Sequence, residues 1–162
     1  IGRLFIEKLL RSCPGIENIY VLIRPEKGES IQEIVDEVVL KSPIFDKLRE
    51  ARPNDLKKVV PIKGDMTMRF FGITLEDLEL LKDKVSVILH SSFLYRHKES
   101  LKAAVESNLL PTKELIKMCH WMKKLDVSFI STHEFPSNLL EIFTGTCVHF
   151  NGRFLLASKE CS

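Results

Sequence analysis

Apolar residues recur along this chain with two different periods, and the alternation of the two predicts an α/β fold. Residues 3–11 have the helical period, because their apolar side chains fall on one face: Leu4, Phe5, Leu9 and Leu10. Cys13-Pro14-Gly15 follows and predicts the end of that helix. The compact β-branched and aromatic run at residues 19–23 then predicts a buried strand.

Three further apolar runs predict strands, and helical patterns separate them. We expect the strands at residues 58–62, 85–89 and 127–130, and the helices at residues 30–40, 44–51, 74–82, 98–108 and 112–124. Ser30 and Glu33 have the spacing of a capping box, in which the two side chains satisfy free amides at a helix start. Because strands and helices alternate, we expect a parallel sheet joined by right-handed crossovers.

Composition is ordinary for a soluble globular domain, with 44% hydrophobic and 28% charged residues. The net charge is +2 and the basic residues are interleaved with acidic ones, so a nucleic-acid partner is not predicted. No apolar run approaches the roughly 20 residues that span a bilayer, and no signal peptide opens the chain. Four scattered cysteines without metal-ligand spacing predict no metal site and favour a reduced, intracellular setting.

Polar residues follow the predicted strands at their carboxyl ends, where parallel α/β sheets bind ligands. They are Arg24, Gly64-Asp65, His90-Ser91-Ser92 and Ser131-Thr132. A cation, a carboxylate and small hydroxyl residues suit a nucleotide with a hydroxyl-rich sugar. These residue types identify no reaction by themselves.

Several segments together resemble the insect-type fatty acyl-CoA reductases, extended members of the short-chain dehydrogenase/reductase superfamily. The resemblance runs from Gly2 to Thr132, and its main segments are Glu7-Lys-Leu-Leu-Arg-Ser-Cys-Pro-Gly15, Tyr20-Val-Leu-Ile-Arg-Pro25, Ser42-Pro-Ile-Phe45, Gly64-Asp65 and Thr112-Lys-Glu-Leu115. It implies a partial Rossmann-type domain over residues 1–135 that binds NADPH, followed by a divergent tail, residues 136–162. It also implies reduction of a long-chain fatty acyl-CoA to an alcohol, and association of the full-length parent with the endoplasmic reticulum or peroxisome membrane.

The resemblance implies cofactor contacts for five residues. Gly2 matches the last glycine of the family's T-G-x-x-G-x-x-G loop, and Arg24 matches the arginine placed to pair with the 2′-phosphate of NADPH. Asp65 matches the aspartate near the adenine, and Ser91 and Ser92 match the small-residue loop beside the sugars. A surface arginine at a strand end and a simple turn aspartate after Gly64 remain the alternative interpretations of Arg24 and Asp65.

The resemblance also implies catalytic roles for Asn108, which matches the asparagine of the catalytic tetrad, and for the strand-end pair Ser131 and Thr132. Two departures from the family pattern lie close to these residues. Pro111 replaces a glycine and predicts a kink near Asn108, while His133-Glu134 replaces Ala-Tyr. The second departure puts a charged pair where a long acyl chain would pass.

The superfamily's Tyr-x-x-x-Lys pair cannot be assembled, because neither Tyr20 nor Tyr95 has a lysine four residues later. We therefore expect this chain to be inactive by itself, with a non-catalytic relative that binds nucleotide or protein as the alternative. The first strand and phosphate loop also have no counterpart before Gly2. Their absence predicts exposed edges on the neighbouring strands, and either marginal stability or self-association.

Overall fold

The chain forms one parallel five-stranded sheet in the order β2-β1-β5-β3-β4. This computed structural model describes residues 2–26, 28–90, 100–130 and 154–157. The strands are β1 (Ile19–Ile23), β2 (Val59–Lys63), β3 (Val87–His90), β4 (Val127–Ile130) and β5 (Phe154–Ala157). The predicted α/β class and parallel sheet are confirmed, with strand bounds that differ from the expected ones by no more than two residues where the two overlap.

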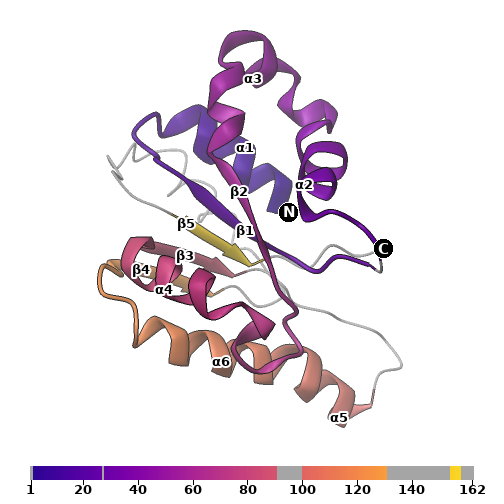
Figure 1. Cartoon of the computed structure of the whole chain (residues 1–162), viewed down its shortest axis with the longest axis vertical. Helices are drawn as coiled ribbons and strands as arrows, with labels where there is room; N and C mark the ends of the chain where they lie inside the picture. The colour runs from indigo at the N-terminus through magenta and orange to yellow at the C-terminus, as the bar shows by residue number, and fades with distance from the viewer. Residues whose placement is uncertain (1, 27, 91–99, 131–153, 158–162) are drawn as a thin grey trace.

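Helices cover both faces of the sheet, as Figure 1 shows. On one side lie α1 (Gly2–Ser12), α2 (Ile31–Ile34) and α3 (Asp46–Ala51), with a π-helical turn at Val35–Leu40 and 3-10 turns at Pro43–Phe45 and Pro53–Lys58. On the other side lie α4 (Leu75–Lys84), α5 (Leu101–Ala104) and α6 (Leu110–Cys119). A 3-10 turn at Arg69–Gly72 precedes α4, and a π-helical turn at Val105–Leu109 joins α5 to α6.

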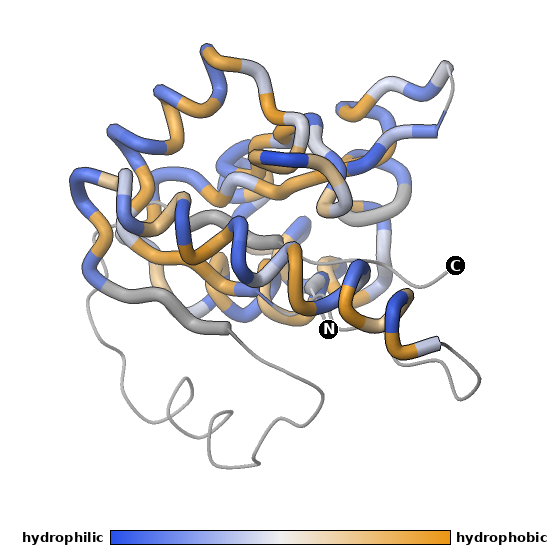
Figure 2. Tube along the Cα trace, turned by 90° about the horizontal axis from the view of Figure 1, so that it is seen from below, coloured by the Kyte–Doolittle hydropathy of each residue, from blue (hydrophilic) through white to orange (hydrophobic). Residues whose placement is uncertain are grey.

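The alternation of side chains along β1 divides the core into two layers. Ile19, Val21 and Ile23 pack with α1 and α3, whereas Tyr20 and Leu22 pack with α4 and α6. All five residues are buried, as expected for an inner strand covered on both faces. Apolar and polar residues alternate along the covering helices in Figure 2, and α1, α3, α4 and α6 turn apolar side chains to the sheet.

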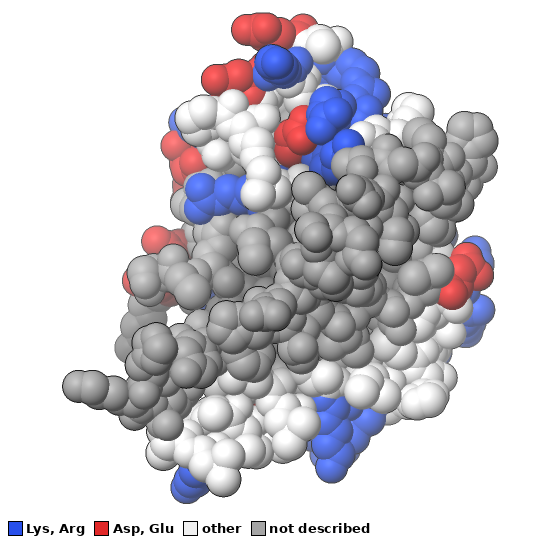
Figure 3. All heavy atoms as spheres, turned by 180° about the vertical axis from the view of Figure 1, so that it is seen from behind, with Lys and Arg blue, Asp and Glu red and all other residues white. Residues whose placement is uncertain are grey.

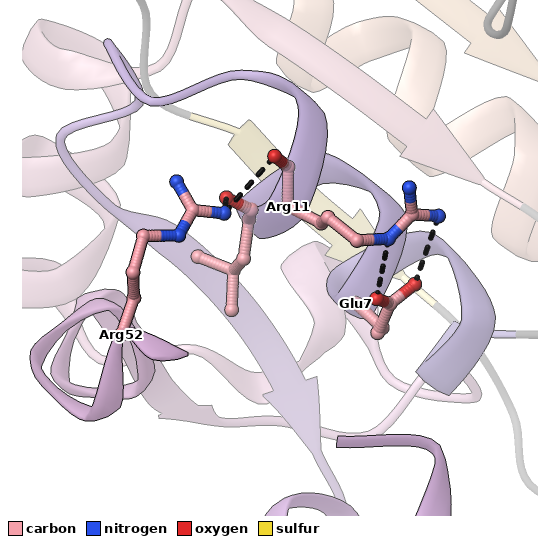
Figure 4. Close-up of polar contacts among 4 residues, drawn as sticks. Glu7, Arg11 and Arg52 are labelled. Atoms are coloured by element: carbon pink, nitrogen blue, oxygen red, sulfur yellow. Dashed lines mark hydrogen bonds and ion pairs between the residues drawn. The ribbon is translucent and has the colours of Figure 1, made fainter. Parts of the chain in front are cut away.

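An arginine from outside the helix caps the carboxyl end of α1. Arg52, just after α3, donates to the carbonyl oxygens of Leu10 and Arg11 at 2.9 and 3.0 Å (Figure 4). These carbonyls have no partner within the helix, and a cation there also complements the helix dipole. Arg11 itself pairs with Glu7 one turn earlier, at 2.7 Å. The helix that precedes β1 is thereby tied to α3.

The expected capping box at Ser30 is wrong. Ser30 has the extended backbone of an N-cap residue, but its hydroxyl makes no capping hydrogen bond. The carboxylate of Glu29 instead accepts from the Glu26 amide at 3.1 Å, which closes the turn before α2. By contrast, Thr74 caps α4 by accepting from the Asp77 amide at 3.2 Å.

The last predicted helix is shorter than the pattern indicated. It ends at Cys119 rather than Lys124, and the chain then turns back towards α4. The Lys123 amide donates to the Lys82 carbonyl at 3.0 Å, and the Lys123 ammonium pairs with Asp83 at 2.8 Å. The helix therefore ends earlier than its apolar pattern indicates, because the segment after Cys119 bonds to α4 instead.

β5 lies at the centre of the sheet, paired in parallel with β1 and with β3. Leu155 is in register with Tyr20 on one side and with Ile88 on the other. In a doubly wound sheet this central place belongs to the strand that precedes the first helix. The expectation that the facing edges of β1 and β3 are exposed is therefore wrong, because the backbone of β5 covers both. The remainder of the tail, residues 136–153 and 158–162, lies outside the described residues.

Candidate functional site

The carboxyl ends of β1 and β2 bring Arg24 and Asp65 into direct contact. The Gly64 amide donates to the Ile23 carbonyl at 2.8 Å, so the two strands stay paired up to their last residues. Arg24 Nε then lies 3.1 Å from Asp65 Oδ2. Arg24 is mostly exposed, with 64% of its side chain accessible, whereas that of Asp65 is 21% accessible. The two residues form one polar unit at the edge where ligands bind in such sheets.

Asp65 is held by the turn that follows it. Its Oδ1 accepts from the Thr67 amide at 2.8 Å and from the Thr67 hydroxyl at 2.7 Å. Its own amide donates to the Phe71 carbonyl at 2.7 Å, and its carbonyl accepts from the Met68 amide at 3.0 Å. An aspartate that accepts from the amide two residues on is a recurrent turn device. Asp65 is thus fixed at both its backbone and its side chain.

A hollow of about 390 Å³ opens beside this pair. Its lining includes two cations, three carboxylates and two turn glycines: Arg24, Lys63, Glu26, Glu29, Asp65, Gly28 and Gly72. The volume is within the range of small-molecule sites. Arg24 and Lys63 are the groups in this lining that can pair with the phosphate of a phosphorylated sugar.

Gly64 is required where β2 ends. A Cβ at this position would overlap Leu22 Cδ1 and come within 2.9 Å of the Phe71 carbonyl oxygen. The end of the Leu22 side chain could move aside. The Phe71 carbonyl could not, because it is backbone and already accepts a hydrogen bond from the Asp65 amide. The glycine therefore permits the close approach that places Asp65 against Arg24.

The turn behind Asp65 has an uncommon backbone. Phe70 and Phe71 adopt φ angles of 48° and 56°, in the left-handed region that side chains disfavour by about 1–2 kcal/mol per residue. Phe71 is buried in the core, which compensates for part of this cost. The Phe70 ring lies against Trp121, and the Arg69 guanidinium stacks on the same ring at 4.9 Å. No glycine marks either position, so sequence reasoning missed this turn.

Glu114 of α6 ties the same turn to the layer that holds α4 and α6. Its carboxylate accepts from the Phe70 amide at 3.5 Å and pairs with Lys117. The Lys117 hydrogen bond lowers the pKa of Glu114 below its usual value of 4.5, and the Phe70 amide adds to this effect. The ionised carboxylate is therefore the form that supports the turn.

A second polar group lies at the end of β3. His90 is buried, at 4% exposure, and its Nε2 lies 3.5 Å from the Thr112 hydroxyl. Thr112 donates to the Asn108 carbonyl at 2.8 Å. Asn108 belongs to the π-helical turn before α6, and Pro111 occupies the first turn of α6. The predicted disturbance near Asn108 is thus a widened helical turn, a feature often found at functional sites.

The other predicted site residues are placed in part. Gly2 begins α1. His90 and Ile130 are register partners in β3 and β4, so the two strands end side by side. Ser91, Ser92, Ser131 and Thr132 follow these ends and lie outside the described residues.

The described residues lack the features of two other kinds of site, a metal centre and a membrane span. They contain no group of three potential metal ligands. None of the helices among them has the length and hydropathy needed to cross a membrane. On the face in Figure 3, the visible charged side chains of the α3 end mix both signs rather than forming a basic surface.

One family model and several known proteins are similar to this chain. The family model for male sterility protein, an NAD-binding domain, matches residues 1–144. The chain belongs to this family of NAD-binding domains. It is 38% identical over 127 residues to fatty acyl-CoA reductase 1 of Mus musculus, covering 78% of this chain and 24% of that reductase. It is 36% identical over 143 residues to fatty acyl-CoA reductase 2 of the same species, covering 88% and 28%.

A putative fatty acyl-CoA reductase of Drosophila melanogaster is 37% identical over 127 residues, which are 78% of this chain and 24% of the fly protein. The expected similarity to fatty acyl-CoA reductases is therefore confirmed, while the near-equal identities to mouse and fly proteins do not single out an insect type. The chain spans about a quarter of the length of these relatives.

Proposed function

We propose that this chain is the NADPH-binding part of a fatty acyl-CoA reductase, whose whole protein reduces a long-chain fatty acyl-CoA to a primary alcohol. The observation that carries the proposal is the Arg24–Asp65 pair beside a hollow at the strand ends, in a chain of an NAD-binding family. The names of the relatives support the substrate class.

The residues beside the hollow fit the phosphorylated end of this cofactor. The guanidinium of Arg24 is exposed and suits the 2′-phosphate that distinguishes NADPH from NADH. Gly2 at the start of α1 would lie near the pyrophosphate, because helix N-termini favour anions. Ser91 and Ser92 would contact the sugars. When bound, the cofactor supplies a hydride to the acyl carbonyl.

Asn108, Ser131 and Thr132 are the residues that we assign to the reaction itself. A hydroxyl of the Ser131-Thr132 pair would donate a hydrogen bond to the substrate carbonyl oxygen, which gains negative charge during reduction. Asn108 would act from the widened turn that Thr112 closes.

The sequence lacks a Tyr-x-x-x-Lys pair, and Tyr20 is buried inside β1. Without a tyrosine to donate the proton, this chain binds the cofactor but does not turn over substrate. The same observation favours the second candidate function, a non-catalytic relative that acts as a nucleotide- or protein-binding module.

Two measurements on the purified chain test the proposal. NADPH is titrated while nicotinamide fluorescence is followed, and the chain is incubated with NADPH and a long-chain acyl-CoA to look for alcohol. We expect saturable binding without alcohol. Absence of any NADPH binding contradicts the cofactor role and favours a protein-binding module, while alcohol production contradicts the expected inactivity.

A further inference from the structure

We propose that His90 and Thr112 are positioning residues for Asn108, joined to it by two consecutive hydrogen bonds that we call the His90–Thr112–Asn108 link. In this link, His90 donates to the Thr112 hydroxyl, and that hydroxyl donates to the Asn108 carbonyl. The inference rests on the proposed function, because Asn108 is one of the residues assigned there to the reaction. It adds two residues that act through the turn carrying Asn108 rather than on the substrate.

The turn that carries Asn108 takes one of its hydrogen bonds from a side-chain hydroxyl. Asn108 belongs to the π-helical turn Val105–Leu109, and Pro111 follows in the first turn of α6. A proline inside a helix supplies no amide donor to the preceding turn. The Thr112 hydroxyl donates to the Asn108 carbonyl at 2.8 Å, beside this proline. The position of the Asn108 backbone is therefore sensitive to a single hydroxyl group.

The direction of the two hydrogen bonds follows from the atoms that form them. A carbonyl oxygen can only accept, so the one hydroxyl proton of Thr112 goes to Asn108. The Thr112 oxygen then accepts from His90 Nε2, which lies 3.5 Å away. The Nε2 atom of His90 must therefore carry a proton, and in a neutral ring Nδ1 carries none. A ring that donates at Nε2 keeps the Thr112 hydroxyl turned towards Asn108.

His90 is a fixed point from which the turn is held. It is the last residue of β3, which is paired with β4 on one side and with β5 on the other, and it is only 4% exposed. Ile88 of the same strand and Leu115 of α6 are buried in one core layer. The His90–Thr112–Asn108 link extends this packing of sheet and helix to the amino end of α6. Functional groups held by rigid elements are placed more precisely than those on loops.

The alternative role for His90 is that of a buried polar group whose hydrogen bonds only satisfy its own ring. Both roles predict a loss of stability when the contact with Thr112 is removed, so stability does not separate them. Only the positioning role predicts that Asn108 moves when Thr112 or His90 is changed. Such a movement matters at a reacting group, because a displacement of about 1 Å can slow catalysis about a hundredfold.

Nuclear magnetic resonance of the whole ¹⁵N-labelled chain tests the direction of the link first. The ring signals of His90 are assigned by their loss in His90→Gln. We expect two-bond nitrogen–proton correlations at pH 7 to show a protonated Nε2. A ring that carries its proton on Nδ1 alone overturns the proposal, because Thr112 would then donate to His90 and not to Asn108.

The side-chain amide signal of Asn108, assigned by its loss in Asn108→Asp, measures the positioning itself. Thr112→Val removes the hydroxyl at nearly constant volume, and Thr112→Ser is the matched control that keeps it. We expect Thr112→Val to shift both the Asn108 amide signal and the His90 Nε2 signal by more than their line widths. Thr112→Ser should leave both close to their original positions. An Asn108 signal that Thr112→Val does not move overturns the positioning role.

Two His90 variants test whether the histidine acts through Thr112. His90→Gln keeps an N–H donor near the place of Nε2 and His90→Leu does not, while both lack an aromatic ring that would itself shift nearby signals. We expect the Asn108 signal to differ between them, and the difference to vanish when Thr112→Val is added. Equal Asn108 signals in the two variants overturn the role of His90. Circular dichroism melts show which variants fold, and the Thr112 pair and the His90 ring signals decide the proposal if His90→Leu does not.

The proposed function fails in a different measurement. Absence of NADPH binding to the unmodified chain, followed by fluorescence titration, contradicts the proposed function and with it the assignment of Asn108 to the reaction. The contrary resonance results overturn the positioning role while NADPH binding remains intact.

Discussion

The ring of Phe70 lies against that of Trp121, with centroids 4.9 Å apart, from a left-handed backbone with a φ of 48°. The contact links the turn behind Asp65 to the segment after α6. Phe70→Ala and Phe70→Gly both remove it, but only glycine adopts a positive φ without strain. We expect Phe70→Gly to be more stable than Phe70→Ala by about 1 kcal/mol.

Urea unfolding of the two Phe70 variants measures this difference directly. In an ordinary helical or extended segment, alanine is the more stable of the two. Equal stability, or a more stable alanine variant, contradicts the left-handed backbone at this position.

Gly64 allows a second test of the same turn. Gly64→Ala would place a methyl group against Leu22 and the Phe71 carbonyl, and we expect it to destabilise the fold by about 1–3 kcal/mol. Gly28→Ala is the matched control, because a Cβ there meets nothing within 4 Å and only its φ of 89° is strained. Thermal or urea unfolding should rank Gly64→Ala as the more destabilising change. The reverse ranking contradicts the close packing at the end of β2.

The Asp83–Lys123 pair predicts a specific response to acid. The Lys123 ammonium, 2.8 Å from Asp83 Oδ1, holds the pKa of that carboxyl below its usual value of 3.8. A carboxyl whose pKa is lowered by folding stabilises the fold above its unfolded pKa, and this contribution is lost as the pH falls through its folded pKa. Asp83→Asn should therefore have a lower urea midpoint than the unmodified chain at pH 7. This difference in midpoint should disappear as the pH falls below about 3.8.

At alkaline pH, Lys123 makes the stability of the fold depend on pH in the opposite direction. The paired Asp83 carboxylate raises the pKa of Lys123 above 10.5, so the contribution of Lys123 to stability persists below about pH 10.5 and disappears as the pH rises through its folded pKa. If Asp83→Asn lowered the urea midpoint equally from pH 7 down to pH 2.5, the charge of Asp83 would not be the source of the stability.

Sequence patterns located most of the elements, because local periodicity determines them. The strands at residues 19–23 and 127–130 and the Thr74 helix start are examples. The place of β5 in the sheet was not predictable from local patterns, because its backbone pairs with strands more than 60 residues away in sequence. Likewise, Arg24 and Asp65 were both identified as strand-end residues, but their contact depends on β1–β2 register and on the Phe70–Phe71 turn.

The central position of β5 yields a further prediction. Leu155→Pro removes a backbone donor from a strand paired on both sides, whereas edge strands tolerate proline. We expect a loss of about 2 kcal/mol or more, because an unpaired buried backbone group alone costs about 1–3 kcal/mol. The edge strand β2 already contains Pro61, so Pro61→Val provides the control and should change stability by less than about 1 kcal/mol. Equal effects of the two variants on the urea midpoint contradict a central β5.

In the proposed function, Arg24 binds the 2′-phosphate of NADPH. The most direct measurement is the ratio of the NADH to the NADPH dissociation constant, determined by fluorescence titration for the unmodified chain, Arg24→Ala and Arg11→Ala. Arg11 is a matched control, since it also pairs with a carboxylate but lies on α1. A charge-assisted contact of about 1.5–3 kcal/mol predicts a ratio of roughly 10 or more for the unmodified chain and for Arg11→Ala, falling towards 1 in Arg24→Ala. A ratio near 1 in the unmodified chain, or one that Arg24→Ala leaves unchanged, contradicts the account.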